Sequence, residues 1–125
     1  MVVAPLVPLK GVREMNYADA VKLLKGKKAR KIGHATVVHI NEDNNIAIKY
    51  HATDIVTISQ DDKITLNNNG WYTPTTKKNI NKYTPINVRV YQSKYDWFVQ
   101  IDKEVRPYKN GMTITENGFQ PVFGA

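Results

Sequence analysis

Short segments in which apolar and polar residues alternate, joined by brief polar turns, constrain the fold of this chain most strongly. In Ile46–Tyr50, two isoleucines and a tyrosine alternate with an alanine and a lysine. This period of two is that of a β-strand with two unlike faces. The polar stretch Asn41–Asn45 before it is only long enough for a hairpin connection to Thr36–Ile40. Short connections of this kind imply antiparallel pairing.

The same alternation recurs along the chain and predicts further strands, which are Asp54–Ser59, Ile64–Leu66, Asn87–Tyr91, Tyr95–Ile101 and Met112–Ile114. We therefore predict the α+β class: a curved antiparallel sheet of six or seven strands, with one helix before the sheet and a short helix inserted between its fourth and fifth strands.

The first predicted helix is Tyr17–Lys25, which Asn16 can cap and Gly26 can end. Its predicted apolar face consists of Tyr17, Ala20, Val21 and Leu24. The second helix begins with Thr75 or Thr76 as its cap and runs to about Lys82, with Ile80 and Tyr83 inward and Lys77, Lys78, Asn81 and Lys82 mostly outward.

A chain of 125 residues is expected to be one domain, residues 1–125. The opening MVVAPLVPLK is apolar with two prolines, so residues 1–15 predict an extended N-terminal arm, and residues 115–125 predict an irregular tail. Both segments carry hydrophobic residues without an obvious partner, so we expect a homo-oligomer. No apolar run approaches the roughly 20 residues of a membrane span, so we do not expect a membrane partner.

The formal net charge is +7, which favours phosphates, acidic protein surfaces or anionic lipids as partners. Six of the eighteen basic residues form one cluster: Lys22, Lys25, Lys27, Lys28, Arg30 and Lys31. This basic segment predicts a nucleic-acid surface, although a solvated charge run explains it equally well.

Catalytic signatures are absent from the sequence. There is no cysteine, and the three histidines, His34, His39 and His51, do not have the spacing of metal ligands or of an acid–base pair. Neither a GxGxxG motif nor a P-loop is present. We expect a protein that is not an enzyme and that holds no metal and no cofactor.

The start of the second predicted helix is the better candidate for a binding site. Helix N-termini offer unpaired N–H groups to anions, and Thr75–Lys78 adds hydroxyl and ammonium groups. Aromatic and basic residues alternate through the following strands, as in proteins that hold nucleotides by stacking and phosphate contacts. The predicted ligand residues are Trp71, Thr75, Thr76, Lys77, Arg89, Tyr91 and Arg106. The alternative is that a threonine merely caps the helix and the lysines are solvated.

Three sequence blocks carry a resemblance to a known family: HATDIVTISQDDKITLNNNGWYTPTTKKNINKY, VRVYQSKYDWFV and YKNGMTI. Their order resembles a group of small bacteriophage proteins with the pattern G-W-x-T-x-T-T-K-x-x-I-N. The similarity covers about Tyr17 to Ile114. Members often carry arginine where this chain has Tyr72, and aspartate or alanine where it has Lys78.

This resemblance implies a phage accessory protein that acts on the host in the cytoplasm of the infected cell, and it supplies no reaction. The chain also looks like the anti-defence proteins that sequester cyclic nucleotide or cyclic ADP-ribose immune signals. The alternative hypothesis is an inhibitor that binds nucleic acid or a host defence protein, such as an anti-CRISPR protein, through the basic segment.

Overall fold

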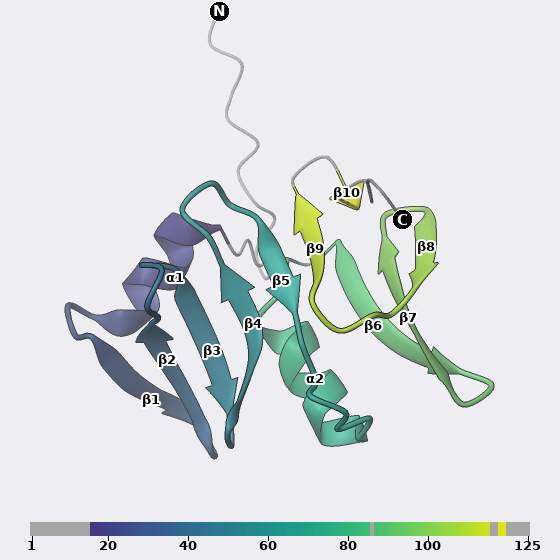
Figure 1. Cartoon of the computed structure of the whole chain (residues 1–125), viewed down its shortest axis with the longest axis horizontal. Coiled ribbons are helices and arrows are strands. Elements are labelled where there is room, and N and C mark those ends of the chain that lie inside the picture. Colours follow the sequence, from purple (N-terminus) through teal and green to yellow (C-terminus); the bar gives the residue numbers. More distant parts are fainter. Residues whose placement is uncertain (1–15, 86, 116–117, 120–125) are drawn as a thin grey trace, which may run out of the picture.

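Two antiparallel sheets and two helices make up the described part of the protein, residues 16–85, 87–115 and 118–119 of the computed structural model (Figure 1). The large sheet has the strand order β1-β2-β3-β4-β5-β9-β10, and the small sheet has the order β6-β7-β8. The elements are α1 (Tyr17–Leu24), β1 (Ala29–Gly33), β2 (Thr36–Ile40), β3 (Ile46–Tyr50), β4 (Thr53–Ile58), β5 (Ile64–Leu66), α2 (Pro74–Lys82), β6 (Val88–Ser93), β7 (Asp96–Ile101), β8 (Glu104–Pro107), β9 (Met112–Thr115) and β10 (Gly118–Phe119).

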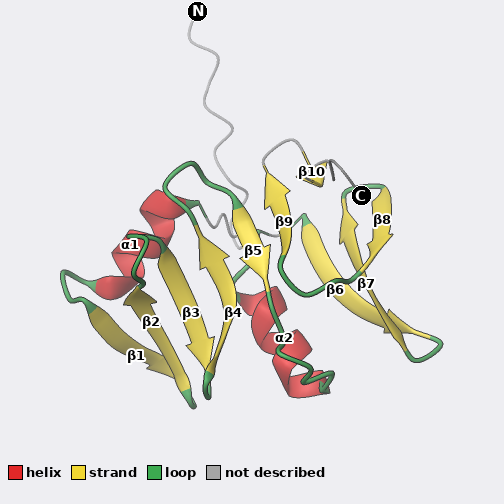
Figure 2. Ribbon diagram, viewed as in Figure 1, coloured by secondary structure: helices red, strands yellow, loops and turns green. Residues whose placement is uncertain are grey.

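The α+β class and the antiparallel pairing are confirmed, but the prediction of a single curved sheet is wrong. After β5 the chain leaves the large sheet, forms α2 and the small sheet, and returns as β9 beside β5. Helix α2 contacts both β4 and β6, so it lies where the two sheets meet (Figure 2). The small sheet is therefore an insertion between two neighbouring strands of the large one.

Three strands were not predicted from the sequence: β1, β8 and β10. The predicted N-terminal arm, residues 1–15, lies outside the described residues. Of the predicted tail, Thr115 ends β9, and Gly118–Phe119 pairs with β9 as the edge strand β10.

One hydrophobic core spans both sheets. Across four strands of the large sheet, Val38, Ile48, Val56 and Leu66 are register neighbours, and all four are fully buried. The small sheet contributes the inward row of Val88, Val90, Trp97, Val99 and Ile101. Burial of this apolar surface is the main stabilising contribution and fixes which face of each strand points to solvent.

Helix α1 begins as predicted: the backbone N–H of Asp19 donates to Asn16 Oδ1 at 2.8 Å. It ends where Lys25 and Gly26 adopt left-handed backbone angles, with φ of 49° and 80°. The prediction that Val21 belongs to the buried face is wrong, because its side chain is 41% exposed while Ala20 and Leu24 are buried.

Helix α2 begins earlier than predicted. Thr73 is the cap, and its Oγ1 accepts the backbone N–H of Thr76 at 3.2 Å. The prediction of Thr75 or Thr76 as the cap is wrong because Pro74 occupies the first helical position, where its missing N–H has no helical partner to lose. The inward placement of Ile80 and Tyr83 is confirmed.

Replacing Thr73 by alanine is expected to lower the free energy of unfolding by about 1 kcal/mol, because it removes the cap of α2. Urea denaturation measures this change. Thr75→Ala is the matched control, because Thr75 is exposed and its hydroxyl does not cap the helix. Equal losses in the two variants would contradict the assignment of the cap.

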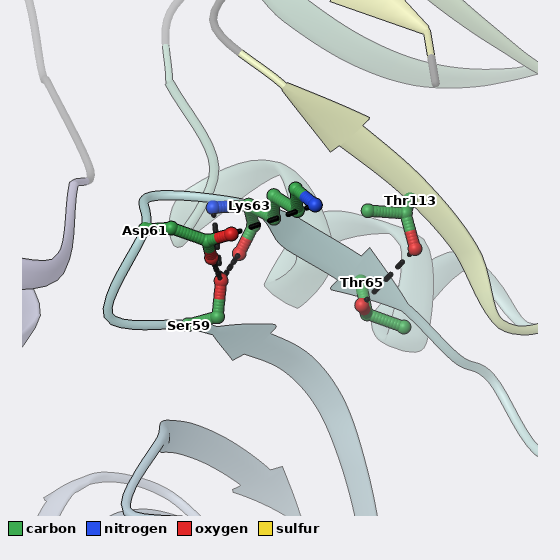
Figure 3. A network of polar contacts seen from close by, with 5 residues as sticks. All are labelled: Ser59, Asp61, Lys63, Thr65 and Thr113. Carbon is green, nitrogen blue, oxygen red and sulfur yellow. Dashed lines mark hydrogen bonds and ion pairs between the residues drawn. The ribbon is translucent and has the colours of Figure 1, made fainter. Parts of the chain in front are cut away.

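The turn between β4 and β5 carries a polar network (Figure 3). The Ser59 hydroxyl donates to Asp61 Oδ1, and Lys63 Nζ lies 3.5 Å from Asp61 Oδ2. The Ser59 hydrogen bond is the largest cause that holds the pKa of Asp61 below its ordinary value. Beyond the turn, Thr65 Oγ1 and Thr113 Oγ1 lie 3.4 Å apart and link β5 to β9.

Ser59→Ala is expected to raise the pKa of Asp61 toward its ordinary value. A lowered folded-state pKa means that the ionised carboxylate stabilises the turn above its unfolded pKa, and that this contribution is lost as the pH falls through the folded pKa. A carboxyl ¹³C NMR titration measures the shift. Ser93→Ala, at the end of β6 in the small sheet, is the control, and an unchanged Asp61 pKa in Ser59→Ala would refute the assignment.

Candidate functional site

The outer face of the small sheet carries a cation and two aromatic rings. Because β6 alternates, Val88 and Val90 point inward while Arg89 and Tyr91 point outward. Tyr91 is the register neighbour of Phe98, and their rings stack with centroids 5.7 Å apart and 28° between the planes. Arg89 Cζ lies 5.5 Å from the centre of the Tyr91 ring. This face is suited to a flat ligand with a negative charge.

A groove runs between this sheet and α2, with a volume of about 420 Å³. We call it the cationic groove; it is lined by Pro74, Lys77, Lys78, Asn81, Arg89, Val90, Tyr91 and Gln92. Asn81 fixes its width, because Asn81 Nδ2 donates to the Val90 carbonyl at 2.8 Å and Asn81 Oδ1 accepts the Val90 N–H at 2.7 Å. The prediction that Asn81 faces mostly outward is therefore corrected: it pairs with the edge of β6.

Three cations of the cationic groove have no acidic partner within the described part of the chain. The ion pairs there use other basic groups, on Lys22, His39, Lys63 and Arg106. Within the described residues, Lys77, Lys78 and Arg89 therefore line the groove without a carboxylate partner, and Lys77 Nζ lies 5.8 Å from the centre of the Trp97 ring. A groove lined by uncompensated positive charges favours an anion.

A second depression lies on the other side of the first turn of α2 and has a volume of about 690 Å³. We call it the apolar pocket; it is lined by Tyr50, His51, Ala52, Thr53, Ile55, Asn68, Asn69, Trp71, Thr73, Thr75 and Thr76. This described lining includes no lysine, arginine, aspartate or glutamate. The two sites therefore differ in charge although they share one helix.

The structure distributes the predicted ligand residues over three places. Lys77, Arg89 and Tyr91 come together in the cationic groove. Trp71, Thr75 and Thr76 line the apolar pocket.

Arg106 lies apart from both sites. Its Nη2 is 2.6 Å from Glu104 Oε2, and its Cζ is 5.0 Å from the centre of the Phe119 ring. Thr76 is buried, and its hydroxyl oxygen accepts a hydrogen bond from Thr73 Oγ1 at 2.9 Å. Both side chains therefore have structural partners already.

Sequence reasoning did not select Lys78 and Asn81 as ligand residues, although both line the groove. Lys78 follows Lys77 at the start of α2, so the doubled lysine was an available signal. Asn81 lies one helical turn after Lys77 and Lys78, which places all three near one face of α2.

The basic segment is spread over α1, β1 and the turn between them. Lys22 belongs to α1 and pairs with Asp19 at 3.9 Å, while Arg30 Nη1 donates to the Leu23 carbonyl at 3.0 Å and ties β1 to α1. Lys25, Lys27, Lys28 and Lys31 are exposed. Lys22 and Arg30 therefore make contacts within the protein, while the four exposed lysines can contact a binding partner.

The histidines do not form a metal centre: within the described residues, no three histidine, cysteine or acidic side chains gather around one point. His39 Nε2 lies 2.7 Å from Asp54 Oδ1 on the outer face of the large sheet. His34 and His51 meet edge to face, with ring centroids 6.3 Å apart, which their sequence separation did not suggest.

Comparison with known proteins identifies the family. Residues 12–115 match the sequence profile described as Kyanoviridae Gp96 protein. Neither the curated proteins nor the solved structures contain a match to the chain. In the described part of the chain, neither helix has the length and apolar character needed to cross a membrane. The match covers most of the chain and confirms the expectation that it belongs to a family of bacteriophage proteins. The protein therefore belongs to the Kyanoviridae Gp96 family of phage proteins.

Proposed function

We propose that this phage protein binds a phosphate-bearing nucleotide in the cationic groove and retains it without converting it. One observation carries the proposal: Lys77, Lys78 and Arg89 line one groove beside the stacked Tyr91–Phe98 pair, and within the described residues none of the three has a carboxylate partner. The cations bind the phosphate, and the half-buried Tyr91 ring contacts the base.

The lining of the groove favours retention over catalysis. Its described polar side chains are two ammonium groups, a guanidinium, two amides and a phenol. Among its described lining residues there is no carboxylate and no histidine, which are the groups that most often act as general bases near neutral pH. Sequestration of a cyclic nucleotide or cyclic ADP-ribose signal in the host cytoplasm is the role that such a site suits best.

Native mass spectrometry tests this function. The protein is incubated with a panel of cyclic oligonucleotides, cyclic ADP-ribose isomers and a short single-stranded DNA, at moderate salt. We expect one phosphate-bearing ligand to be retained with its mass unchanged, and Lys77→Ala to reduce the bound fraction. Retention of no phosphate-bearing ligand would refute the proposal, and a changed ligand mass would indicate an enzyme.

A second candidate is binding of nucleic acid or of a host defence protein through the basic segment. It is favoured by the exposure of Lys27, Lys28 and Lys31 around the edge strand β1. Counterion release predicts that log affinity for DNA falls with log salt by about 0.7 to 0.9 per phosphate contacted. Loss of this slope in a Lys27→Glu, Lys28→Glu variant would support the candidate, and retention of the slope would assign nucleic-acid binding to another surface.

A further inference from the structure

The apolar pocket is built by two fixed turns. The end of β3 contributes Tyr50, and the β3–β4 turn contributes His51. Their ring centroids lie 4.4 Å apart, and the His51 N–H donates to the Ala35 carbonyl at 2.8 Å. The loop between β5 and α2 contributes Trp71, which is 62% exposed although it is one of the largest apolar side chains of the protein. Aromatic walls around an open volume favour a planar ligand.

Asn68 is the one buried side chain in the described residues with an unpartnered polar atom. It is fully buried and lines the pocket, and its Nδ2 has no hydrogen-bond partner there. Its other groups are all occupied. Asn68 Oδ1 accepts the Gly70 N–H at 2.9 Å, the Asn68 N–H donates to Asn110 Oδ1 at 3.1 Å, and the Asn68 carbonyl accepts the Trp71 N–H at 2.8 Å.

These bonds fix the orientation of the Asn68 amide. Because the Gly70 N–H requires an acceptor, the oxygen of the amide must face it, and the amide nitrogen is left as an unsatisfied donor. A buried donor without a partner is costly and rare in folded proteins, so it requires an explanation. A ligand atom in the pocket that accepts a hydrogen bond from Asn68 Nδ2 would explain the unpaired donor.

We propose that the apolar pocket binds an uncharged planar heteroaromatic ring of the nucleobase kind. A carbonyl oxygen or ring nitrogen of the base accepts from Asn68 Nδ2, and the face of the base lies against Trp71. The ring is uncharged because the described lining has no lysine, arginine or acidic side chain. The base can come from a free nucleoside or from a larger nucleotide. This site is separate from the cationic groove and does not depend on phosphate binding there.

Fluorine NMR on full-length protein labelled with 5-fluorotryptophan tests the proposal. The chain has two tryptophans, so Trp71 reports on the pocket and the buried Trp97 is the internal reference. Adenosine, guanosine, cytidine and uridine are titrated first, and the corresponding dinucleotides second. We expect at least one nucleoside to shift the Trp71 signal saturably while the Trp97 signal stays in place. A shift with dinucleotides alone would overturn binding of the free base.

Two variants and a control sharpen this test, with binding measured by calorimetry. Asn68→Asp replaces the donor by an acceptor and is expected to weaken nucleoside binding by about tenfold or more.

Trp71→Ala changes only an exposed side chain and is expected to weaken binding similarly while leaving the fold intact. This variant therefore tests the proposal even if Asn68→Asp does not fold. Arg106→Ala, which lines neither the apolar pocket nor the cationic groove, should leave nucleoside binding unchanged. Unaltered binding in Trp71→Ala, or no response to any nucleoside or dinucleotide at millimolar concentration, would overturn the proposal and leave a buried water as the partner of Asn68.

Discussion

Replacing Arg89 by alanine is expected to weaken binding of a phosphate-bearing nucleotide by about 10- to 100-fold. Hydrogen bonds to charged groups contribute about 1.5–3 kcal/mol, and about 1.4 kcal/mol corresponds to a tenfold change in affinity. Arg89 also covers one face of Tyr91, so its loss disturbs the ring on which the base is expected to stack. Isothermal titration calorimetry with the retained nucleotide measures the change.

The control for this experiment is Arg106→Ala. Arg106 is also an arginine of the small sheet, but it pairs with Glu104 and does not line the cationic groove. The Arg106→Ala variant should bind the nucleotide with the same affinity as the unmodified protein. Because Arg89 is exposed, its variant should also keep the melting temperature. Normal affinity in Arg89→Ala, or a large loss of stability, would mean that Arg89 has a structural role instead.

Replacing Asn81 by alanine is expected to lower the free energy of unfolding by about 2–3 kcal/mol, since it leaves both backbone groups of Val90 without their side-chain partner. For a domain of this size the melting temperature should fall by about 10 °C. The variant should also bind the nucleotide less tightly, because α2 and β6 are no longer held at a fixed distance.

Thermal denaturation with Asn79→Ala as the control measures this effect. Asn79 lies on the same helix, and its amide donates only to the Thr75 carbonyl within the first turns of α2. The Asn79→Ala variant is therefore expected to lose only a little stability. If both variants melted at the same temperature, the link between Asn81 and Val90 would not be what holds the helix against the small sheet.

Local features of the fold could be predicted from the sequence because their causes are local. The cap at Asn16, the hairpins and the inward face with Ile80 follow from residues a few positions apart. The division into two sheets could not be predicted. Strand β5 pairs with β9, which follows in the chain only after the whole small sheet, and a period of two shows which face is buried but not which strand is the neighbour.

Strand β1 was missed for a related reason. Its residues Ala29–Gly33 lie in the basic segment, and as an edge strand it needs few apolar side chains. The start of α2 was missed although the signal was present: proline favours the first helical position, and this points to Thr73 as the cap.

For the candidate site, the residue types were more predictable than their grouping. The alternation of β6 predicts that Arg89 and Tyr91 share a face, and the structure adds Lys77 from α2 to the same groove. The sequence could not show that Trp71 and Thr75 lie on the opposite side of that helix. Nor did it contain a signal for Asn68, since its unpaired amide results from contacts with residues as distant as Asn110.

An NMR titration of ¹⁵N-labelled protein with the nucleotide panel tests the central claim most directly. If the cationic groove is the site, the backbone signals of Lys77, Lys78, Arg89 and Tyr91 should shift together and saturate, and these shifts should be absent in Arg89→Ala. Shifts confined to the basic segment from Lys22 to Lys31, or no shift with any phosphate-bearing ligand, would contradict the account.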